Sequence, residues 1–479
     1  MLRRFTDVCV AYVQRFMPNP YLYAVILTFV CVILNFILVR GVTPAGTVTA
    51  WYQGVWGTQN IFTFALQMVL ILVSGYTLAQ APVVRRFLRW LASKPHNQTQ
   101  GALMCFFAAG VASLVNWGLG LIVAGVVARE VARRLQRNFH YGYLVAAGYM
   151  GYIVWTNGFS SSIALANTDP HSNLNIIFQM TKRTVPFTDS IFQPYSWIGV
   201  VATFVLIPVA LKFMAPHKER LPRPEVLAPD PGDEPRTADG AETGDEAKAV
   251  RDDGPGTVAR ATFHRTPAEV LESAWILNLI LAAAGIAYFV ISGFALDIAS
   301  LVMLFTVAGL ILHWTPERFI AAFYESAKTS GSLILQYPLY GGIIALLTFA
   351  PTHGATTLAA VIAGALVHIA NETTLPFFNY IGSLIISLFV PSGGGHWGVQ
   401  GPVTIAAAKE VGLTSTAYLG KLSMSVAMGE QVTNMIQPFW ALPVLAIAGL
   451  RVRDMMGFTV VAFVIGAVVF GACTFIPAL

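Results

Sequence analysis

The sequence predicts an all-α polytopic membrane protein made of two inverted repeats, each with a re-entrant hairpin and a broken transmembrane helix. Of its 479 residues, 56% are hydrophobic and 11% are charged, and the mean hydropathy is +0.64. Soluble proteins carry about 25% charged residues, so this composition indicates a chain that lies mostly in lipid. The repeats follow from a second observation: glycine- and amide-interrupted apolar segments occur in both halves of the chain.

The clearest repeat pairs residues 116–130, NWGLGLIVAGVVARE, with residues 396–410, HWGVQGPVTIAAAKE. Aligned without gaps, they share a Trp-Gly pair and a final glutamate, and Arg129 meets Lys409. Duplicated units with discontinuous helices are typical of secondary transporters. In the second copy, PSGGGHWGVQGP at 391–402 has three consecutive glycines and two prolines, from which we expect no regular helix. Such backbone must be buried in protein or line a watery cavity.

The chain divides into a first repeat at 1–215, a linker at 216–265 and a second repeat at 266–479. The linker holds 8 basic residues, 11 acidic residues and seven prolines, which predicts a disordered cytoplasmic segment. Outside the linker, basic residues gather at the ends of apolar segments. The net charge of +5 is therefore a topology signal and not a nucleic-acid signal, and it places the N-terminus in the cytoplasm.

In the first repeat, the hairpin is the main inference. Residues 101–128 are apolar, are interrupted near Trp117–Gly118, and have basic residues at both ends. We therefore expect the segment to enter and leave from the cytoplasm; the alternative is one long tilted helix. The other expected elements, in order, are an amphipathic lead-in at 1–19, a helix at 21–39, a polar loop at 41–60, a helix at 61–79, an interfacial helix at 83–93, a broken helix at 141–166 interrupted at 156–162, and a helix at 197–214.

In the second repeat, the hairpin at 379–410 opens from the periplasm. The broken helix at 419–450 is interrupted at 429–434 and 437–438, where polar residues and a proline occur. Of the apolar stretches 331–350 and 358–368, only one should cross completely. The remaining expected elements are helices at 268–292 and 298–313, an interfacial helix at 316–328 and a final span at 455–478.

The four interrupted segments can converge near the membrane midplane and form a binding site. Helix N-termini there suit a carboxylate, and unwound carbonyls suit Na⁺. The interrupted stretches carry neutral donors and no Arg or Lys, which favours a small monoanion. The candidate substrate-binding residues are Asn116, Trp117, Gly118, Asn157, Ser160, Ser161, Ser392, Gly394, His396, Trp397, Gln400, Thr433, Asn434 and Gln437. The candidates for the coupling ion or proton are Thr156, Asn157, Glu430 and Asn434.

Each of these candidates has a simpler interpretation. Glu430 is either a functional carboxyl group, since acids are costly at this depth, or a hydrogen-bonded structural acid. His396 either exchanges protons or binds substrate, or it packs the hairpin tip. Trp117 and Trp397 either wall an acyl chain or contact the scaffold.

An enzyme is excluded by what the sequence lacks. It has no cluster with metal-ligand spacing, no nucleophile–base pair and no nucleotide motif. The four cysteines are scattered without a pairing pattern.

Four runs resemble the bacterial short-chain fatty acid transporter family: RRFTDVCVAYVQRFMPNPYLYAVILTF, NWGLGLIVAGVVAREVARR, PSGGGHWGVQGP and GEQVTNMIQPFWALP. The resemblance implies an ion-coupled carboxylate transporter of the bacterial inner membrane, a homodimer with a fixed scaffold and a moving, elevator-type transport domain. It implies acetate, butyrate or acetoacetate as substrate and no cofactor beyond Na⁺ as a candidate coupling ion. Coupling to Na⁺ or H⁺ stays open, and an uncoupled facilitator or channel is the alternative.

A division of labour between broken and continuous segments completes the prediction. The hairpins and broken helices should bind substrate and move. The continuous helices at 21–39, 61–79, 268–292 and 298–313 should pack in the lipid bilayer as the scaffold and form the dimer interface.

Overall fold

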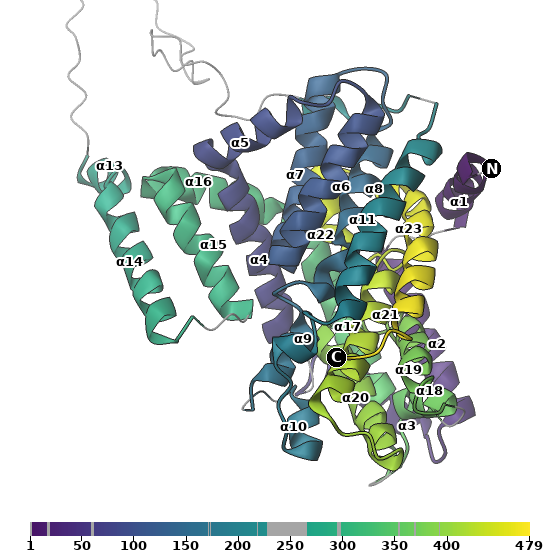
Figure 1. The fold of residues 1–479 in the computed structure, drawn as a ribbon. Helices are drawn as coiled ribbons and strands as arrows, with labels where there is room; N and C mark the ends of the chain where they lie inside the picture. The colour runs from purple at the N-terminus through teal and green to yellow at the C-terminus, as the bar shows by residue number, and fades with distance from the viewer. Residues whose placement is uncertain are drawn as a thin grey trace, which may run out of the picture.

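The computed structural model describes residues 2–16, 20–58, 62–170, 172, 174–217, 219–227, 266–294, 298–352, 355–367, 370–391 and 393–479. These residues form helices and no β-strand, apart from an isolated bridge between His140 and Arg220 (Figure 1). The all-α prediction is confirmed.

The helices of the first half are α1 (Leu2–Phe16), α2 (Pro20–Leu38), α3 (Pro44–Val55), α4 (Phe62–Gln80), α5 (Pro82–Ala92), α6 (Gln98–Val115), α7 (Trp117–Leu135), α8 (Tyr141–Gly151), η1 (Tyr152–Asn157), α9 (Ser162–Thr168), α10 (Ile176–Thr181), η2 (Phe187–Asp189), α11 (Pro194–Met214) and α12 (Pro224–Leu227). Those of the second half are α13 (Pro267–Glu272), α14 (Trp275–Ile291), α15 (Ile298–His313), α16 (Pro316–Ala327), η3 (Lys328–Ser330), α17 (Gly331–Thr348), α18 (Leu358–Val367), α19 (Leu375–Ile386), α20 (Gly393–Glu410), α21 (Thr416–Thr433), α22 (Ala441–Ala448) and α23 (Val452–Cys473).

The loop expected at 41–60 is wrong, because α3 occupies most of it. Thr43 caps this helix by accepting from the Gly46 N–H, and Pro44 fills its first position, where a missing N–H costs nothing. A capping residue followed by proline is typical of a helix start, but the polar composition of residues 41–60 led to the prediction of a loop.

Hairpin one, formed by α6 and α7, is two antiparallel helices and not one long helix. The break is at Asn116, which ends α6 and caps α7. A Cβ on Gly101 would meet Val131, and one on Gly120 would meet Ser113. The start of α6 therefore lies beside the end of α7, and the helices meet at the tip. The hairpin spans 98–135, which is longer than the predicted 101–128.

Hairpin two, formed by α19 and α20, corrects the expectation that 391–402 cannot be helical. Helix α20 begins at Gly393, runs through the glycines and contains Pro402. Packing of α20 on α18 and α21 outweighs the free-energy cost of placing these residues in a helix, which is roughly 1 kcal/mol for each glycine and 3 kcal/mol for a proline. The break lies before the glycines, between α19 and α20.

The first broken helix follows the prediction. Helix α8 ends at Gly151, continues as the tight turn η1, and resumes as α9 after residues 158–161. In the second, α21 stays helical through Thr433, so the interruption begins at Asn434, later than expected, and ends at Trp440. Helix α21 packs directly on η1.

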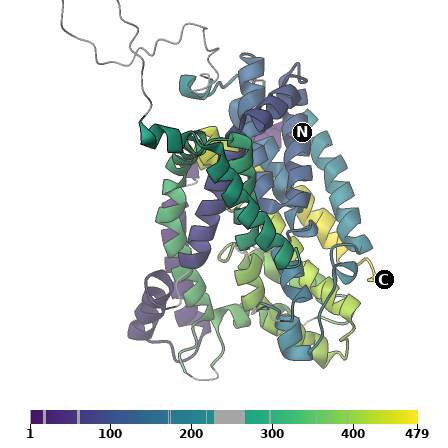
Figure 2. The ribbon, with the colours of Figure 1, turned by 90° about the vertical axis from the view of Figure 1, so that its left-hand side faces the viewer.

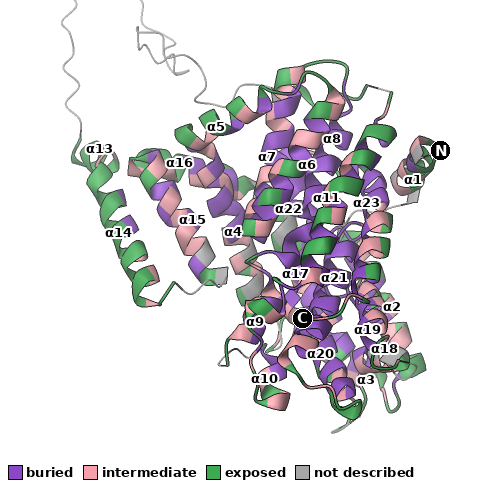
Figure 3. Ribbon diagram, viewed as in Figure 1, coloured by how far each residue is buried: buried purple, intermediate pink, exposed green. Residues whose placement is uncertain are grey.

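The two halves repeat a set of helix contacts. Helix α6 packs on α8 as α19 packs on α21, α7 packs on α22 as α20 packs on α9, and α5 packs on α7 as α18 packs on α20 (Figures 1 and 2). The centre is the buried part of the molecule, whereas α14 packs mainly on α15 and exposes most of its surface (Figure 3).

Among the described residues, four helices are long and apolar enough to cross a bilayer: Tyr21–Leu38, Gln98–Val115, Pro194–Met214 and Val452–Cys473. The pair α4 and α5, bent by 78°, adds a fifth if it counts as one span. Of the two stretches left open by the sequence, α17 has 18 residues and α18 has 10. At 1.5 Å per residue, α17 is about 27 Å long and α18 about 15 Å, so only α17 approaches the bilayer thickness.

Most of the predicted linker lies outside the described residues. Its described start, residues 216, 217 and 219–227, contacts the helices. Arg220 forms an ion pair with Asp454 at 2.7 Å, and Arg133 donates to the Val226 carbonyl.

Candidate functional site

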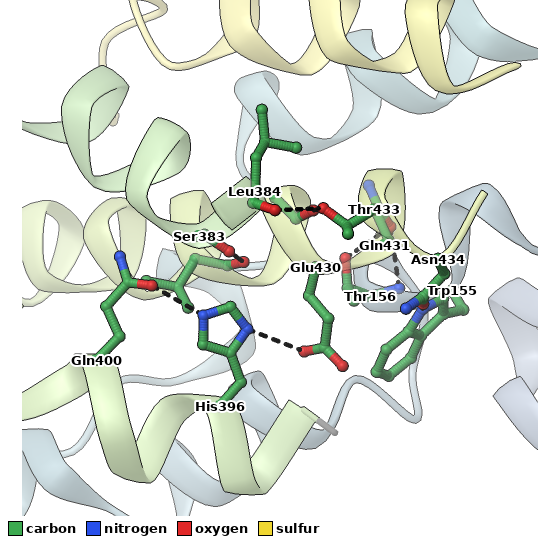
Figure 4. Close-up of polar contacts among 12 residues, drawn as sticks. Trp155, Thr156, Ser383, Leu384, His396, Gln400, Glu430, Gln431, Thr433 and Asn434 are labelled. Atoms are coloured by element: carbon green, nitrogen blue, oxygen red, sulfur yellow. Dashed lines mark hydrogen bonds and ion pairs between the residues drawn. The ribbon is translucent and has the colours of Figure 1, made fainter. Parts of the chain in front are cut away.

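Side-chain hydrogen bonds join the first interruption to the end of α21 and to Asn434, where the second interruption begins (Figure 4). The side-chain oxygen of Gln431, Oε1, accepts from the backbone N–H of Thr156 at 3.1 Å and from the Thr156 hydroxyl at 2.6 Å. The Gln431 amide donates to Asn157 Oδ1 at 2.8 Å. The Trp155 indole N–H donates to Asn434 Oδ1 at 3.0 Å. The structure thus brings together Thr156, Asn157 and Asn434 from opposite halves of the chain.

We call this cluster of Trp155, Thr156, Asn157, Gln431 and Asn434 the junction. Gln431 holds it together, and sequence reasoning missed this residue. It lies in the stretch 429–434, next to the site candidate Glu430. An amide there can satisfy both the backbone and the side chains of an unwound turn, and this was the available signal.

Glu430 and His396 form a buried pair beside the junction. Both side chains are completely buried, and His396 Nδ1 lies 4.0 Å from Glu430 Oε2. Neither carboxyl oxygen has a hydrogen-bond partner within the described part of the chain. Removing a carboxylate from water costs several kcal/mol, so this group needs a proton, a protonated imidazole or a bound cation.

A hydrogen-bond network behind His396 fixes which ring nitrogen carries hydrogen. The Gln400 amide donates to the backbone and side-chain oxygens of Asn379, both at 2.8 Å. The side-chain oxygen of Gln400, Oε1, lies 2.8 Å from His396 Nε2 and can only accept, so Nε2 is the donor. A hydrogen on Nε2 leaves Nδ1 of the neutral ring as a lone pair facing Glu430. One further proton satisfies both groups.

Asn379 is a second residue that sequence reasoning missed. Besides accepting from Gln400, its Oδ1 accepts from the Thr404 hydroxyl at 2.6 Å. Its amide donates to the Leu422 carbonyl and to the Ser425 hydroxyl. It therefore joins α19, α20 and α21 behind the buried pair.

Buried polar atoms without a partner gather at the two interruptions. Native proteins satisfy nearly all such atoms, so each exception needs an explanation such as water, an ion or substrate. Within the described residues, those at the interruptions are Asn157 Nδ2, Asn434 Nδ2, the hydroxyl groups of Tyr152 and Ser161, and Trp440 Nε1, while the Ser387 hydroxyl lies at the end of α19 and others, such as Asn35 Oδ1, lie elsewhere.

The tip of hairpin one uses its own N–H groups. Asn116 Oδ1 accepts from Gly118 and Leu119, and the Ser160 hydroxyl accepts from the Trp117 N–H at 2.8 Å. Asn116 and Ser160 therefore occupy the donors that the sequence suggested for an anion.

The two repeat tryptophans have different surroundings. Trp117 packs on Trp440, with ring centroids 5.0 Å apart, and lines an apolar pocket. Trp397 is completely buried and donates to Asn167 Oδ1 at 3.2 Å, so it fastens α20 to α9.

Residues 1–476 match the family described as "Short chain fatty acid transporter". The chain belongs to this family. Two curated relatives named "Putative short-chain fatty acid transporter" agree. That of Escherichia coli (strain K12) is 35% identical over 98% of each chain, and that of Haemophilus influenzae (strain ATCC 51907 / DSM 11121 / KW20 / Rd) is 32% identical over 98% of each. These are transporters and not enzymes, as the sequence predicts.

Two solved structures are remotely similar. The YdaH transporter of Alcanivorax borkumensis is 15% identical, with a TM-score of 0.40 over 96% of this chain and 97% of its own. MtrF of Neisseria gonorrhoeae, which is described with a class of antimetabolite efflux pumps, is 14% identical, with a TM-score of 0.44 over 99% of this chain and 97% of its own.

The other described site candidates of this short-chain fatty acid transporter family member make contacts of their own. Thr433 donates to the Leu384 and Gly429 carbonyls, and Gln437 donates to the Tyr340 hydroxyl. Both thus make contacts that hold helices together. Gly394 is half-buried, and a Cβ there would meet Leu174. Ser392 lies outside the described residues.

Proposed function

We propose that this protein is a secondary active transporter that moves short-chain fatty acids or related small monocarboxylates across the bacterial inner membrane, coupled to an ion. Acetate, butyrate and acetoacetate are the proposed substrates. Family membership supports the substrate class. The neutral donors Asn157, Ser161 and Asn434 at the junction suit a monoanion, since a multiply charged anion would favour a guanidinium.

The buried pair of Glu430 and His396 is the observation that carries the coupling. The network fixes Nε2 of His396 as a donor, so the pair has a place for one further proton. A buried acid that gains and loses a proton as the site changes sides is a means of H⁺ coupling. The alternative is coupling to Na⁺, bound at Thr156, Asn157, Glu430 and Asn434. Transport driven by a pH gradient or by a Na⁺ gradient distinguishes the two.

The same proposal includes the architecture. The helix contacts that recur in both halves support two repeats, which we propose to be inverted, with hairpins that re-enter from opposite sides. The hairpins and broken helices would move as a transport domain. Helices α2, α4, α14 and α15 would form the scaffold and the interface of a homodimer, with the N-terminus in the cytoplasm.

The test is counterflow of labelled butyrate in proteoliposomes, with and without Na⁺ and at two pH values. Rates must be taken above those of protein-free liposomes, because undissociated short-chain acids cross lipid unaided. We expect counterflow, and net uptake that an imposed pH gradient accelerates and a Na⁺ gradient does not. Acceleration by Na⁺ alone would assign the coupling to Na⁺. If counterflow occurs but neither gradient accelerates net uptake, the protein is a facilitator. If net flux occurs without counterflow, it is a channel.

A further inference from the structure

Helix α5 turns sharply away from the end of α4. The two helices are bent by 78°, and Ala81 alone separates them. The proposed architecture makes α4 a scaffold helix that crosses the bilayer, so α5 lies close to the membrane plane. Gln98, shortly after α5, donates to the Pro216 carbonyl, which places α5 and the start of the linker at the same end of the molecule (Figure 1). In the proposed topology this end is cytoplasmic.

One face of α5 is apolar and exposed. Leu88 and Ala92 are buried on the opposite side, where α5 packs on α7. The exposed face carries Val83, Phe87 and Trp90, spaced i, i+4 and i+7. Each of them is more than half exposed, and the rings of Phe87 and Trp90 are stacked. We call these three residues the apolar stripe. An exposed stripe of this kind marks a site of contact with lipid or with another protein.

A basic face borders the apolar stripe. It consists of Arg85, Arg86 and Arg89. Lys94 continues the stripe past the end of the helix, and its Nζ lies 4.8 Å from the centroid of the Trp90 ring. Helix α5 has no acidic residue, and none occurs anywhere in residues 8–129. The positive charge of α5 is therefore not neutralised by acidic residues from its own part of the chain.

We infer that α5 is a binding surface for the acidic phospholipids of the cytoplasmic leaflet. The apolar stripe lies among acyl chains, and the arginines bind the phosphate groups of the headgroups, which guanidinium groups recognise with paired hydrogen bonds. A zwitterionic lipid offers the same chains but no net charge to attract the helix. Because α5 packs on α7, a bound acidic lipid anchors the end of hairpin one in the leaflet. Only the orientation of α5 in the membrane rests on the proposed function.

The experiment uses the quenching of tryptophan fluorescence by lipid. The full chain is reconstituted in bilayers of phosphatidylcholine and phosphatidylglycerol, with bromine on the acyl chains of one of the two lipids. Bromine quenches tryptophan on contact, and the part of the quenching that Trp90→Phe removes reports on α5. We expect brominated phosphatidylglycerol to quench Trp90 more than brominated phosphatidylcholine does at the same mole fraction.

Two substitutions on the basic face should abolish this preference. Arg86→Gln and Arg89→Gln, combined in one chain, should lower the association constant of phosphatidylglycerol relative to phosphatidylcholine by about fivefold for each arginine, equivalent to ~1 kcal/mol. Added salt should lower the same constant in the wild type, because it screens exposed charges. Thermal melting checks the fold, and the single variants are measured if the combined variant does not fold.

The matched control combines Arg134→Gln and Arg137→Gln. These two arginines are exposed near the end of α7, so the control removes the same charge from the same end of the molecule and leaves α5 intact. It should keep the preference of Trp90 for phosphatidylglycerol.

Three outcomes would overturn the inference. Equal quenching of Trp90 by the two lipids in the wild type refutes a preference for acidic lipid. An equal loss in the control variant refutes α5 as the site. If neither lipid quenches Trp90, protein such as a second copy of the chain covers the apolar stripe, and the lipid surface is refuted. No readout depends on transport, so a protein that binds phosphatidylglycerol at α5 but exchanges no short-chain acid refutes the proposed transport alone.

Discussion

The two helical hairpins share a repeat sequence but differ in what stands at their tips. In hairpin one, Asn116 and Ser160 occupy the first N–H groups of α7, and apolar side chains surround the tip. In hairpin two, the helix that begins with glycines carries His396 and Gln400, and behind them Asn379 joins three helices. The N–H groups of the first tip are bonded by Asn116 and by Ser160 of the first interruption, whereas the second hairpin carries His396 Nδ1, which is buried and lacks a hydrogen-bond partner.

The difference indicates that the two repeats have specialised. A tip whose polar groups are satisfied within itself is suited to be a wall, because it gives nothing up when the substrate leaves. Hairpin two instead places His396 against Glu430 of α21, a buried acid without a hydrogen bond that a proton or cation can stabilise reversibly. The substitutions below test whether hairpin one is the wall and hairpin two the exchanging side.

Glu430→Gln is expected to have the largest effect. Glutamine keeps the shape of the side chain but cannot take up or release the proton. Net uptake driven by a pH gradient should fall by at least about tenfold, equivalent to ~1.4 kcal/mol, while exchange of labelled butyrate continues. If gradient-driven uptake and exchange both stay at the wild-type level, Glu430 is a structural acid.

Asn157→Ala and Asn434→Ala should each weaken substrate affinity by roughly 5- to 150-fold, because a buried hydrogen-bonding partner is worth about 1–3 kcal/mol. Butyrate KM in proteoliposomes is the measurement. Asn278 is the matched control: it is a buried asparagine that donates to the Leu310 carbonyl in the α14–α15 pair. A shift of less than about twofold for both junction variants, or an equal shift for Asn278→Ala, removes these asparagines from the site.

Asn97 is exposed, but it does not serve as such a control. Its side chain accepts from the Gln100 N–H and caps α6. Its replacement by alanine would affect the stability of hairpin one.

Asn379→Ala tests the network of hairpin two and should act on stability. It leaves the Thr404 hydroxyl without its acceptor and the Gln400 side-chain amide with only the backbone carbonyl of residue 379, at a cost of about 1–3 kcal/mol. The melting temperature in detergent should fall by more than in Asn278→Ala, which removes one bond of 3.3 Å. Equal melting temperatures would mean that the network is not the support of His396.

The sequence allowed the interruptions to be located but not the partners that they find. Asn116 and the run 156–162 break helices for local reasons, namely capping and glycine, and both were predicted. Helix α20 was not, because its packing on α18 and α21 overrides the preferences of its glycines and Pro402. Pairs such as Gln431–Asn157 and Trp397–Asn167 are separated by more than 200 residues and carry no sign in either stretch. Specific polar partners depend on the three-dimensional packing, which a single sequence does not reveal.

Asn116 gives the smallest expected effect and the most direct test of the closed tip. If its role is to cap α7, Asn116→Ala should reduce stability by ~1 kcal/mol, and Asn116→Ser, which keeps an acceptor, should restore it. Butyrate KM should then change only in the alanine variant, which loses stability, and return to normal in the serine variant. The reason is that the cap already uses the N–H groups of Gly118 and Leu119, so they do not bind substrate. A serine variant with normal melting but strongly raised KM would show the opposite: the amide of Asn116 contacts the substrate, and hairpin one takes part in binding as hairpin two does.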